Sequence, residues 1–417
     1  MKIALFHNLT SGGAKRASYE VIRRLAKNHS VTVYTLSSAN LEFCDLRGAV
    51  DGHQIYAFKP LSHFESPLGR LNQLQRWRDL KELLRLGRQI ASQVNSEDYD
   101  LAYLHPCQFT QAPTLLRYLE IPTVYHVHEP LRRAYEPSRP RPYMNSGLRK
   151  TLDRVDPLLA IYQQELIQVD REMTGAADLL LANSQFTADT VSRIYGRSSK
   201  VSYFGVDTET FRPLPDSTGE GNYVLSVGAL TPYKGFDFLV EAVAKIPSKS
   251  RPNLRIVCNA VDERELAYLR NLAVSRGVDL YIEGPIGETE LLKRYNEAAV
   301  LAYAPFREPF GLVPIESMSC GTPVIGVDEG GVRETVFDGE NGLLVPREST
   351  AFAKAIESLL CDRKLRRRLG QQARECALLQ WSWEKSVERI EDQLRSVLPV
   401  SNGRTPVWQN VPLRQQV

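Results

Sequence analysis

The chain has 417 residues, of which 43% are hydrophobic and 24% are charged, and its formal net charge is +3. This length is too great for one ordinary hydrophobic core and predicts two domains of about 200 residues each. The composition is typical of a soluble globular protein. A membrane-spanning protein is excluded because no apolar run approaches the roughly 18 residues that a transmembrane helix requires.

The first half of the chain alternates short apolar runs with amphipathic stretches, which is typical of a parallel sheet wrapped by helices. Its opening, MKIALFHN, predicts a strand at residues 2–6 and not a secretory leader, because the apolar run ends after a few residues. An Arg- and Pro-rich stretch, residues 132–150, predicts an irregular loop. Between this strand and this loop we predict a helix at residues 14–27 and strands at residues 31–35, 101–104 and 123–127.

The pattern restarts after a Pro-rich linker around residues 213–215. We predict strands at residues 223–227, 255–258, 280–283, 300–304, 323–327 and 343–345, with helices between them. Two such halves in tandem predict two Rossmann-like domains whose parallel sheets face each other across a cleft. We expect residues 1–207 to form the first domain, residues 208–382 to form the second, and residues 399–417, which lack periodicity, to form a loose tail.

Cysteine spacing and charge indicate where the protein works. The six cysteines are scattered without paired or zinc-type spacing, which predicts reduced thiols in a cytoplasmic protein. Residues 1–150 contain 21 Lys and Arg against 13 Asp and Glu, whereas the rest of the chain contains 31 against 36. The positive N-terminal region favours an anionic partner, such as a lipid head group at the inner face of a membrane, a diphosphate carrier or an acidic glycan. Ordinary solvated surface explains the same charge equally well, including the run Arg70, Arg76, Arg78, Arg85 and Arg88 on a predicted helix.

The most informative stretch, residues 307–331, reads REPFGLVPIESMSCGTPVIGVDEGG. Pro314 suits the first turn of a helix, and Gly311 lets a ligand approach the backbone because no Cβ stands in the way. The backbone amides of Phe310, Gly311, Leu312 and Val313 would then be unpaired donors at a helix N-terminus, where a phosphate binds readily.

Two carboxylates, Glu308 and Glu316, stand eight residues apart in this stretch. Glu316, one turn into the helix, is placed to accept hydrogen bonds from a ribose diol. Glu308, in the preceding loop, is placed to hold the hydroxyls of a sugar beyond the phosphates. An ordinary βα turn with two surface glutamates is the alternative, but the combination with the helix-start residues and with Gly330–Gly331 favours a nucleotide-sugar site.

This stretch resembles the E-x7-E signature of retaining GT-B glycosyltransferases of family 4. Three further segments resemble other parts of that family in the expected order: ANSQFTADTVSRIYG (182–196), FGVDTETFRP (204–213) and VGALTPYKG (227–235). The resemblance implies an enzyme that moves a sugar from a nucleotide diphosphate sugar to an acceptor hydroxyl in polysaccharide or glycolipid synthesis. The donor would lie on the second domain and the acceptor, a glycan, a lipid-linked or a small molecule, across the first. The last helix, about 383–398, would cross back to the first domain.

The resemblance also implies roles for individual residues. No residue is an obvious nucleophile, so the leaving phosphate itself would accept the acceptor's proton. Lys234 would neutralise the diphosphate, and His128, just past the predicted strand 123–127, would contact the transferred sugar together with Glu308. His126 points the same way as His128 along the strand but is better explained as a core histidine. Gly12–Gly13 opens the first helix, where Gly13 would let a donor's diphosphate or an acceptor approach, although a lone glycine pair is often only a tight turn. The dinucleotide fingerprint G-x-G-x-x-G is absent, which argues against a dehydrogenase.

Two positions depart from the family pattern. Ala229 stands where most members have an arginine that shares the diphosphate with the lysine, and Cys258–Asn259 stands where a glycine-rich turn is usual. Arg307 and Arg333 are the candidates to replace that arginine, and Arg333 is preferred because its glycine loop should face the diphosphate.

We expect no metal, no cofactor and no nucleic-acid partner. The acidic pair in Asp98–Tyr99–Asp100 precedes a strand at its far end from the crevice and is interpreted as structural. Two other functions stay open: a nucleotide-sugar epimerase or hydrolase on the same fold, and a non-catalytic sugar-nucleotide binding protein, for which Ala229 is the only indication.

Overall fold

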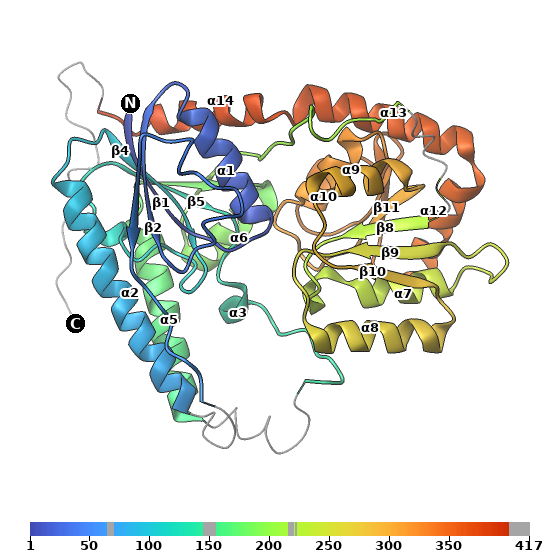
Figure 1. The fold of residues 1–417 in the computed structure, drawn as a ribbon, viewed down its shortest axis with the longest axis horizontal. Coiled ribbons are helices and arrows are strands. Elements are labelled where there is room, and N and C mark those ends of the chain that lie inside the picture. The colour runs from blue at the N-terminus through green and yellow to red at the C-terminus, as the bar shows by residue number, and fades with distance from the viewer. Residues whose placement is uncertain (65–70, 145–155, 216–220, 222, 400–417) are drawn as a thin grey trace.

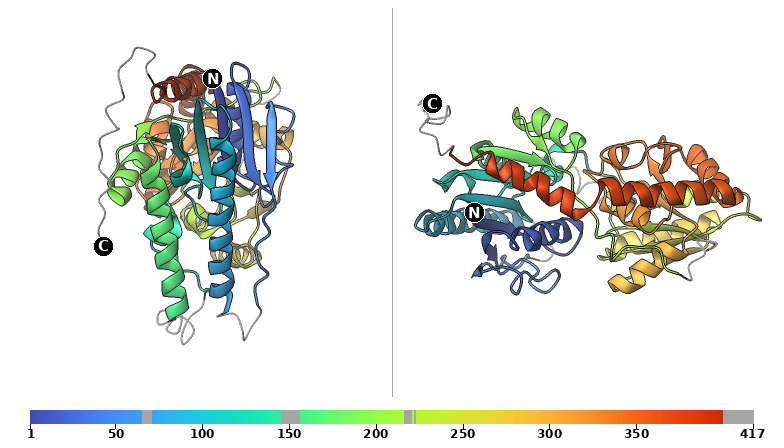
Figure 2. Two further views of the ribbon diagram at one scale, coloured as in Figure 1. Left: turned by 90° about the vertical axis from the view of Figure 1, so that its left-hand side faces the viewer. Right: turned by 90° about the horizontal axis from the view of Figure 1, so that it is seen from above.

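The computed structural model describes residues 1–64, 71–144, 156–215, 221 and 223–399 (Figure 1). Within these residues the chain forms two parallel β-sheets, each covered by helices, which lie side by side along the longest axis of the molecule (Figures 1 and 2). The predicted fold class, two Rossmann-like domains with parallel sheets, is confirmed. The predicted tail lies outside the described residues, apart from residue 399.

The first sheet has seven described strands in the order β3-β2-β1-β4-β5-β6-β7. Strand β1 pairs with β2 on one side and with β4 on the other, so the strand order reverses between β1 and β4. In open sheets of this kind, ligands bind at the carboxyl ends of the strands next to such a reversal. The strands are β1 (Lys2–Asn8), β2 (Ser30–Leu36), β3 (Gly52–Tyr56), β4 (Leu101–Cys107), β5 (Thr123–Val127), β6 (Leu179–Ala182) and β7 (Lys200–Val201).

The second sheet has six described strands in the order β10-β9-β8-β11-β12-β13, and its order reverses between β8 and β11. The loops that follow these two strands contain Lys234 and Glu308, so the sheet brings both residues to its carboxyl edge. The strands are β8 (Tyr223–Val227), β9 (Asn253–Val257), β10 (Leu280–Glu283), β11 (Val300–Tyr303), β12 (Val324–Val327) and β13 (Gly342–Val345).

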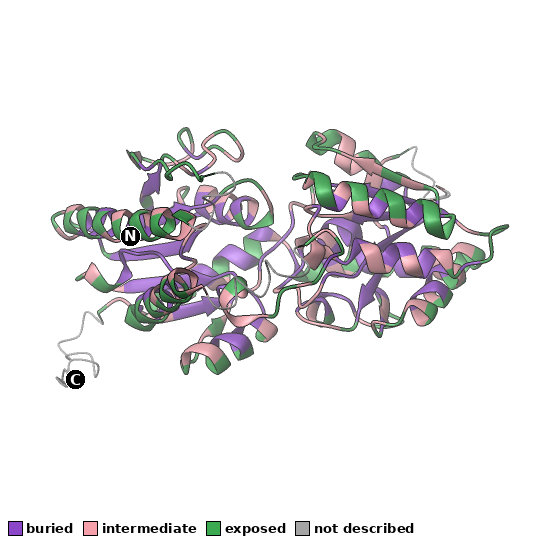
Figure 3. Ribbon diagram, turned by 90° about the horizontal axis from the view of Figure 1, so that it is seen from below, coloured by how far each residue is buried: buried purple, intermediate pink, exposed green. Residues whose placement is uncertain are grey.

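The helices bury apolar stripes against the sheets and turn polar faces outward (Figure 3). Several begin with a capping side chain, as at Ser184, Asp262 and Ser382, whose oxygens accept backbone N–H groups of the first turn. In the first half the helices are α1 (Gly13–Leu25), α2 (Asn72–Asn95), η2 (Leu116–Tyr118), α3 (Arg132–Tyr135), α5 (Pro157–Ala176) and α6 (Gln185–Tyr195). In the second half they are η3 (Pro232–Lys234), α7 (Phe236–Ala244), α8 (Glu263–Arg276), α9 (Glu288–Glu297), α10 (Leu312–Ser319), α11 (Val332–Thr335), α12 (Ser349–Cys361), α13 (Arg363–Gln380) and α14 (Trp383–Arg395).

Two connections join the halves. Helix α14 follows the second sheet in the chain but packs on α1, where Glu384 accepts from Arg24 Nε at 3.1 Å and Glu391 pairs with His29 (Figures 1 and 2). The described part of the predicted irregular loop contains the short helix α3 and then runs to α8. There the buried Arg141 guanidinium donates to Asp237 and Glu265, at 2.9–3.1 Å. Because both carboxylates belong to the second half, this network fixes the loop across the boundary between the halves.

Candidate active site

The candidate site is centred on an ion pair between two loops of the second half. Lys234 Nζ lies 3.0 and 2.9 Å from the two carboxylate oxygens of Glu308. The loops approach each other this closely because Gly235, at φ 68°, follows the lysine: a Cβ there would lie 2.1 Å from the Ala304 carbonyl oxygen. The fold therefore brings together two of the three residues that were predicted to be catalytic.

Positive charge keeps Glu308 ionised although it is enclosed. Burial alone would raise the pKa of the Glu308 carboxyl, but Lys234 and then Arg132 favour its charged form, and its pKa is lowered. Arg132, from α3 in the first half, donates to the Phe306 carbonyl at 2.5 Å and lies 4.6 Å from the Tyr233 ring centroid. A second cation from the opposite half thus faces the Lys234–Glu308 pair.

The start of α10 leaves backbone donors free beside Glu308. Gly311 adopts φ 99°, a conformation that favours glycine, and caps the helix without a side-chain hydrogen bond. Within the described part of the chain, the amides of Phe310, Gly311, Leu312 and Val313 donate to no protein acceptor. These four amides are the donors that the sequence predicted for a phosphate.

A glycine pair supports the Glu308 loop from behind. A Cβ at Gly330 would lie 2.6 Å from the Glu308 carbonyl oxygen, and one at Gly331 would lie 2.3 Å from that of Pro309. The Gly331 amide donates to the Glu308 carbonyl at 2.8 Å. Gly330–Gly331 therefore contacts the backbone of the Glu308 loop, which explains two glycines at this place without a direct contact to phosphate.

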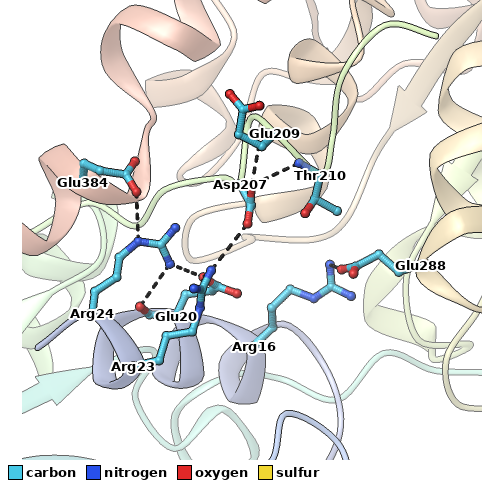
Figure 4. Close-up of polar contacts among 9 residues, drawn as sticks. All are labelled: Arg16, Glu20, Arg23, Arg24, Asp207, Glu209, Thr210, Glu288 and Glu384. Carbon is cyan, nitrogen blue, oxygen red and sulfur yellow. Dashed lines mark hydrogen bonds and ion pairs between the residues drawn. The ribbon is translucent and has the colours of Figure 1, made fainter. Parts of the chain in front are cut away.

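Glu316 lies one turn into α10, where its buried carboxylate accepts a hydrogen bond from the Tyr295 hydroxyl at 2.7 Å. Arg16 of α1 reaches across from the first half, 3.7 Å from Glu316 and 3.1 Å from Glu288 (Figure 4 shows the Arg16–Glu288 pair). Burial raises the pKa of Glu316, and Arg16 and Tyr295 offset this only in part.

Arg16 lines a pocket between α1, α10 and the segment 205–211 that joins the two halves, together with Asp207, Thr210 and Leu312. Figure 4 shows the polar contacts on its α1 side, where Arg23 pairs with Asp207 and Arg24 pairs with Glu384. Gly13 opens α1 beside this pocket, and a Cβ on it would lie 3.4 Å from Leu312 Cδ1. Gly13 and the start of α10 therefore face each other across the boundary between the halves.

His128 belongs to a buried group of histidines at the carboxyl ends of β4 and β5. Its Nε2 lies 3.1 Å from His105 Nδ1, and burial lowers the pKa of His128 to about 3. The ring of Phe204 joins this group to the α10 loop, because its centroid lies 5.0 Å from that of His128 and 6.0 Å from that of Phe310. His126 is a core histidine, and its Nδ1 is hydrogen-bonded to the Tyr103 hydroxyl at 2.7 Å.

The histidine spacing in the sequence did not indicate a cluster, whereas the structure contains one. Ligand atoms of His105, His126 and His128 all lie within 4.8 Å of one another, which is close enough for a metal ion. Neighbouring strands bring the three together, and only two of them are close in sequence, so their spacing gave no signal. All three are buried, and His105 also lies 3.1 Å from the Ser18 hydroxyl.

Arg333, which was predicted to bind the diphosphate, contacts a nearby residue in this structure. Its guanidinium donates to the Asp328 side chain and carbonyl, both at 2.6 Å, and 57% of its side chain is exposed. Arg307, at φ 47°, lies 3.7 Å from Glu136 and 5.6 Å from the Phe186 ring. Arg132, which the sequence did not single out, is the arginine that the fold places near enough to Glu308 to favour its charged form. Its only sequence signal is its position four residues after His128.

Two family models match the chain in succession. The model described as Glycosyltransferase Family 4 matches residues 11–210, and the model described as Glycosyl transferases group 1 matches residues 207–376. Together they cover most of the chain, and the predicted family is confirmed. The chain belongs to the group 1 (family 4) glycosyltransferases.

Curated relatives include two D-inositol 3-phosphate glycosyltransferases. The one from Streptomyces bingchenggensis is 33% identical over 245 residues, which are 54% of this chain and 54% of that protein. The one from Acidothermus cellulolyticus is 34% identical over 267 residues, 59% of this chain and 58% of that protein. The chain therefore spans somewhat more than half the length of the curated relatives it matches.

Solved structures agree over nearly the whole chain. Sucrose-phosphate synthase from Thermosynechococcus elongatus superposes with a TM-score of 0.74 at 20% identity, covering 95% of this chain and 99% of that chain. Anabaena HepE in complex with UDP and glucose superposes with a TM-score of 0.69 at 20% identity, covering 95% and 100%. At this identity the likeness establishes the fold.

Proposed function

We propose that this protein is a retaining glycosyltransferase that moves a sugar from a nucleotide diphosphate sugar to an acceptor hydroxyl, in polysaccharide or glycolipid synthesis. The observation that carries the proposal is the Lys234–Glu308 ion pair beside the unpaired amides at the start of α10. A cation, a row of N–H donors and a carboxylate are what a diphosphate followed by a sugar requires.

In the proposed complex, Lys234 and the α10 amides bind the diphosphate, and Glu308 is released to accept hydrogen bonds from sugar hydroxyls. Glu316, held in place by Tyr295, accepts the ribose hydroxyls. Negative charge grows on the diphosphate as the glycosidic bond breaks, so fixed donors at this position lower the barrier. The pocket needs no nucleophile: the leaving phosphate takes the proton of the acceptor hydroxyl, and the protein orients the two substrates.

The first half supplies the acceptor side. His128 faces the α10 loop through Phe204, and we assign it a contact with the transferred sugar. Because burial lowers its pKa to about 3, it acts there as a neutral hydrogen-bonding group and not as a cation. HepE is bound to UDP and glucose, and the curated relatives are glycosyltransferases, which supports a sugar nucleotide as donor.

The acceptor and its location are part of the same proposal. Residues 1–150 carry an excess of eight positive charges, which supports an anionic glycan, carrier or lipid-linked acceptor and contact with the inner face of a membrane. None of the described helices is long and apolar enough to cross a bilayer, and all six cysteines are free. We therefore propose a cytoplasmic enzyme that meets the membrane from outside the bilayer.

Thermal unfolding in the presence of UDP, GDP or ADP, and of their sugar conjugates, tests the donor site. A ligand that binds only the native protein raises its melting temperature. One nucleotide series should stabilise the wild-type protein, and Glu316→Ala should lose that shift while melting normally without ligand. No stabilisation by any nucleotide would contradict the proposed donor site.

A further inference from the structure

The outer face of α2 combines exposed apolar and basic side chains. Its exposed positions recur at intervals of three and four residues, so they lie on one stripe of the helix. The stripe begins with apolar side chains and continues with basic ones: Leu71, Leu74, Arg78, Lys81, Arg85 and Arg88. The opposite stripe, which includes Leu80, Leu83 and Ile90, is buried in the first half of the molecule. We call the exposed stripe the α2 outer face.

Further exposed apolar residues gather at the N-terminal end of α2. Residues 61–64, which precede the helix, are held beside it by hydrogen bonds: the Leu61 amide donates to Asp79 at 3.1 Å, and the Phe64 amide donates to Asn72 at 2.6 Å. Six of the thirteen large hydrophobic residues that are exposed among the described residues lie at this end of α2 and on the neighbouring α5: Leu61, Phe64, Leu71, Leu74, Trp77 and Ile161. Such gathering is uncommon on a free protein surface and indicates a binding surface.

The two helices project from the molecule at this end. Trp77 and Lys81 of α2 both pair with Glu165 of α5, so the helices lie side by side. Figures 1 and 2 show that α2 and α5 extend together beyond the first sheet at their N-terminal ends. An extension of this kind can reach a surface that the bulk of the molecule does not touch.

The charge of this end is positive after its internal pairs are counted. Among the nearby acids, Glu82 pairs with Arg85 and Glu165 with Lys81. Asp79 accepts the Leu61 amide and offsets one of the remaining positive charges. Arg76 and Arg78 are exposed, and neither has an acidic partner among the described residues. The surface therefore offers free guanidinium groups next to exposed leucine and aromatic side chains.

We propose that the α2 outer face and the adjoining end of α5 form a docking surface for an anionic lipid bilayer. The leucines, Phe64 and Trp77 enter the boundary between head groups and acyl chains, and the arginines bind lipid phosphates. A second copy of the chain fits less well, because a two-fold contact would oppose two positive faces. The inference rests on the proposed use of a membrane-associated acceptor, and it names the surface that meets the membrane.

Vesicle flotation of the full chain tests the inference. The wild-type protein should float with vesicles of phosphatidylcholine and phosphatidylglycerol, float poorly with phosphatidylcholine alone, and detach as salt is raised. Leu74→Asp with Arg78→Glu should weaken binding on the order of tenfold or more, because it removes an inserted side chain and reverses a charge. The matched control is Val274→Asp with Lys249→Glu, which makes the same kinds of change at exposed positions of the second half and should bind like wild type.

Nucleotide-induced thermal stabilisation of the same variants separates this inference from the proposed function. If Leu74→Asp with Arg78→Glu loses vesicle binding but is stabilised by the nucleotide as the wild type is, the docking surface is supported. The docking surface would be overturned by equal loss of binding in both double variants, or by equal binding of the wild type to neutral and anionic vesicles. A wild-type dimer in solution that Leu74→Asp with Arg78→Glu dissociates would also overturn it. Absence of vesicle binding with normal nucleotide stabilisation would refute the docking surface and leave the donor site intact.

Discussion

At the scale of single residues, Glu308 carries the most specific prediction. Replacing it with alanine should reduce transfer to background, because the sugar loses the carboxylate that holds its hydroxyls, while the protein remains folded. Glu308→Gln keeps the size but not the charge, and should retain only a small fraction of wild-type kcat. Initial rates with saturating donor, together with circular dichroism, are the measurements. Near wild-type turnover in a folded Glu308→Ala protein would remove Glu308 from the site.

The second prediction at this scale concerns which arginine takes the role of the family arginine that is missing at Ala229. Arg132 lies near enough to Glu308 to favour its charged form, whereas Arg333 is held by Asp328 at the surface. Loss of a preorganised charged donor at a developing charge costs about 3 kcal/mol, or roughly a hundredfold in rate. Arg132→Ala should therefore lower kcat on that order, and Arg333→Ala should change it little. The reverse ranking would restore the interpretation drawn from the sequence.

Which site residues the sequence could reveal depended on where their partners lie. Glu308 and Gly311 belong to one short stretch, and its loop-to-helix pattern can be recognised from the sequence alone. Arg132 and Arg16 become recognisable only when the two halves meet, because their partners are 174 and 300 residues away. For Arg333, position along the chain did not reveal that its guanidinium donates a hydrogen bond to Asp328.

At the scale of elements, the start of α10 predicts insensitivity to chelators. Four free amides and Lys234 supply the positive potential that a metal ion provides in other diphosphate sites. Transfer measured in excess EDTA should equal transfer in magnesium. Activity that disappears in EDTA and returns with magnesium would show that a metal completes the site. A return with zinc alone would instead point to the histidine group formed by His105, His126 and His128.

The ends of strands β4 and β5 predict a pH dependence of stability. Burial lowers the pKa of His126 well below its usual value of 6.5, so below pH 6.5 the unfolded state binds a proton that the native state does not. The contribution of His126 to the free energy of unfolding is therefore at its full value above pH 6.5, and it falls by about 1.4 kcal/mol per pH unit below pH 6.5. Burial raises the pKa of Asp170 to about 6, which acts in the opposite direction, so a comparison of variants is required.

Urea unfolding of the wild type and His126→Phe between pH 7.5 and pH 5 makes this comparison. The variant should show the shallower loss of stability as pH falls, by about 1.4 kcal/mol per pH unit. His63→Asn removes an exposed histidine and should follow the wild type. Parallel curves for all three proteins would mean that His126 titrates alike in both states.

Strand prediction succeeded where burial on both faces left a continuous apolar run, as in β1, β5 and β11. It missed β3, because GHQIY is a half-exposed edge strand without such a run, and β7, which has only two residues. It also missed β6, although LLLA is a largely buried apolar run. All three strands belong to the first sheet, so the strands predicted for the second half still placed Lys234 and Glu308 correctly at a carboxyl edge.

At the scale of the whole molecule, two tandem halves with a restart near residue 223 were enough to predict the architecture. The sequence could not show how the halves are fastened. The Arg141 network with Asp237 and Glu265 joins a loop of one half to helices of the other, and no local pattern marks such partners. The proposed docking surface at the N-terminal end of α2 could not be recognised from the sequence either, since its charge alone is explained by ordinary solvation.

The central claim is that the two halves together transfer a sugar, and acceptor-dependent nucleotide release tests it most directly. The purified protein is incubated with the nucleotide sugar that stabilises it, with and without an extract of anionic glycans and lipid carriers, and the free nucleoside diphosphate is measured. The proposal predicts release that rises strongly with acceptor and is lost in Glu308→Ala. Equal release without acceptor would indicate a hydrolase or epimerase, and binding without any release would indicate a non-catalytic protein; either result would contradict the proposed transfer.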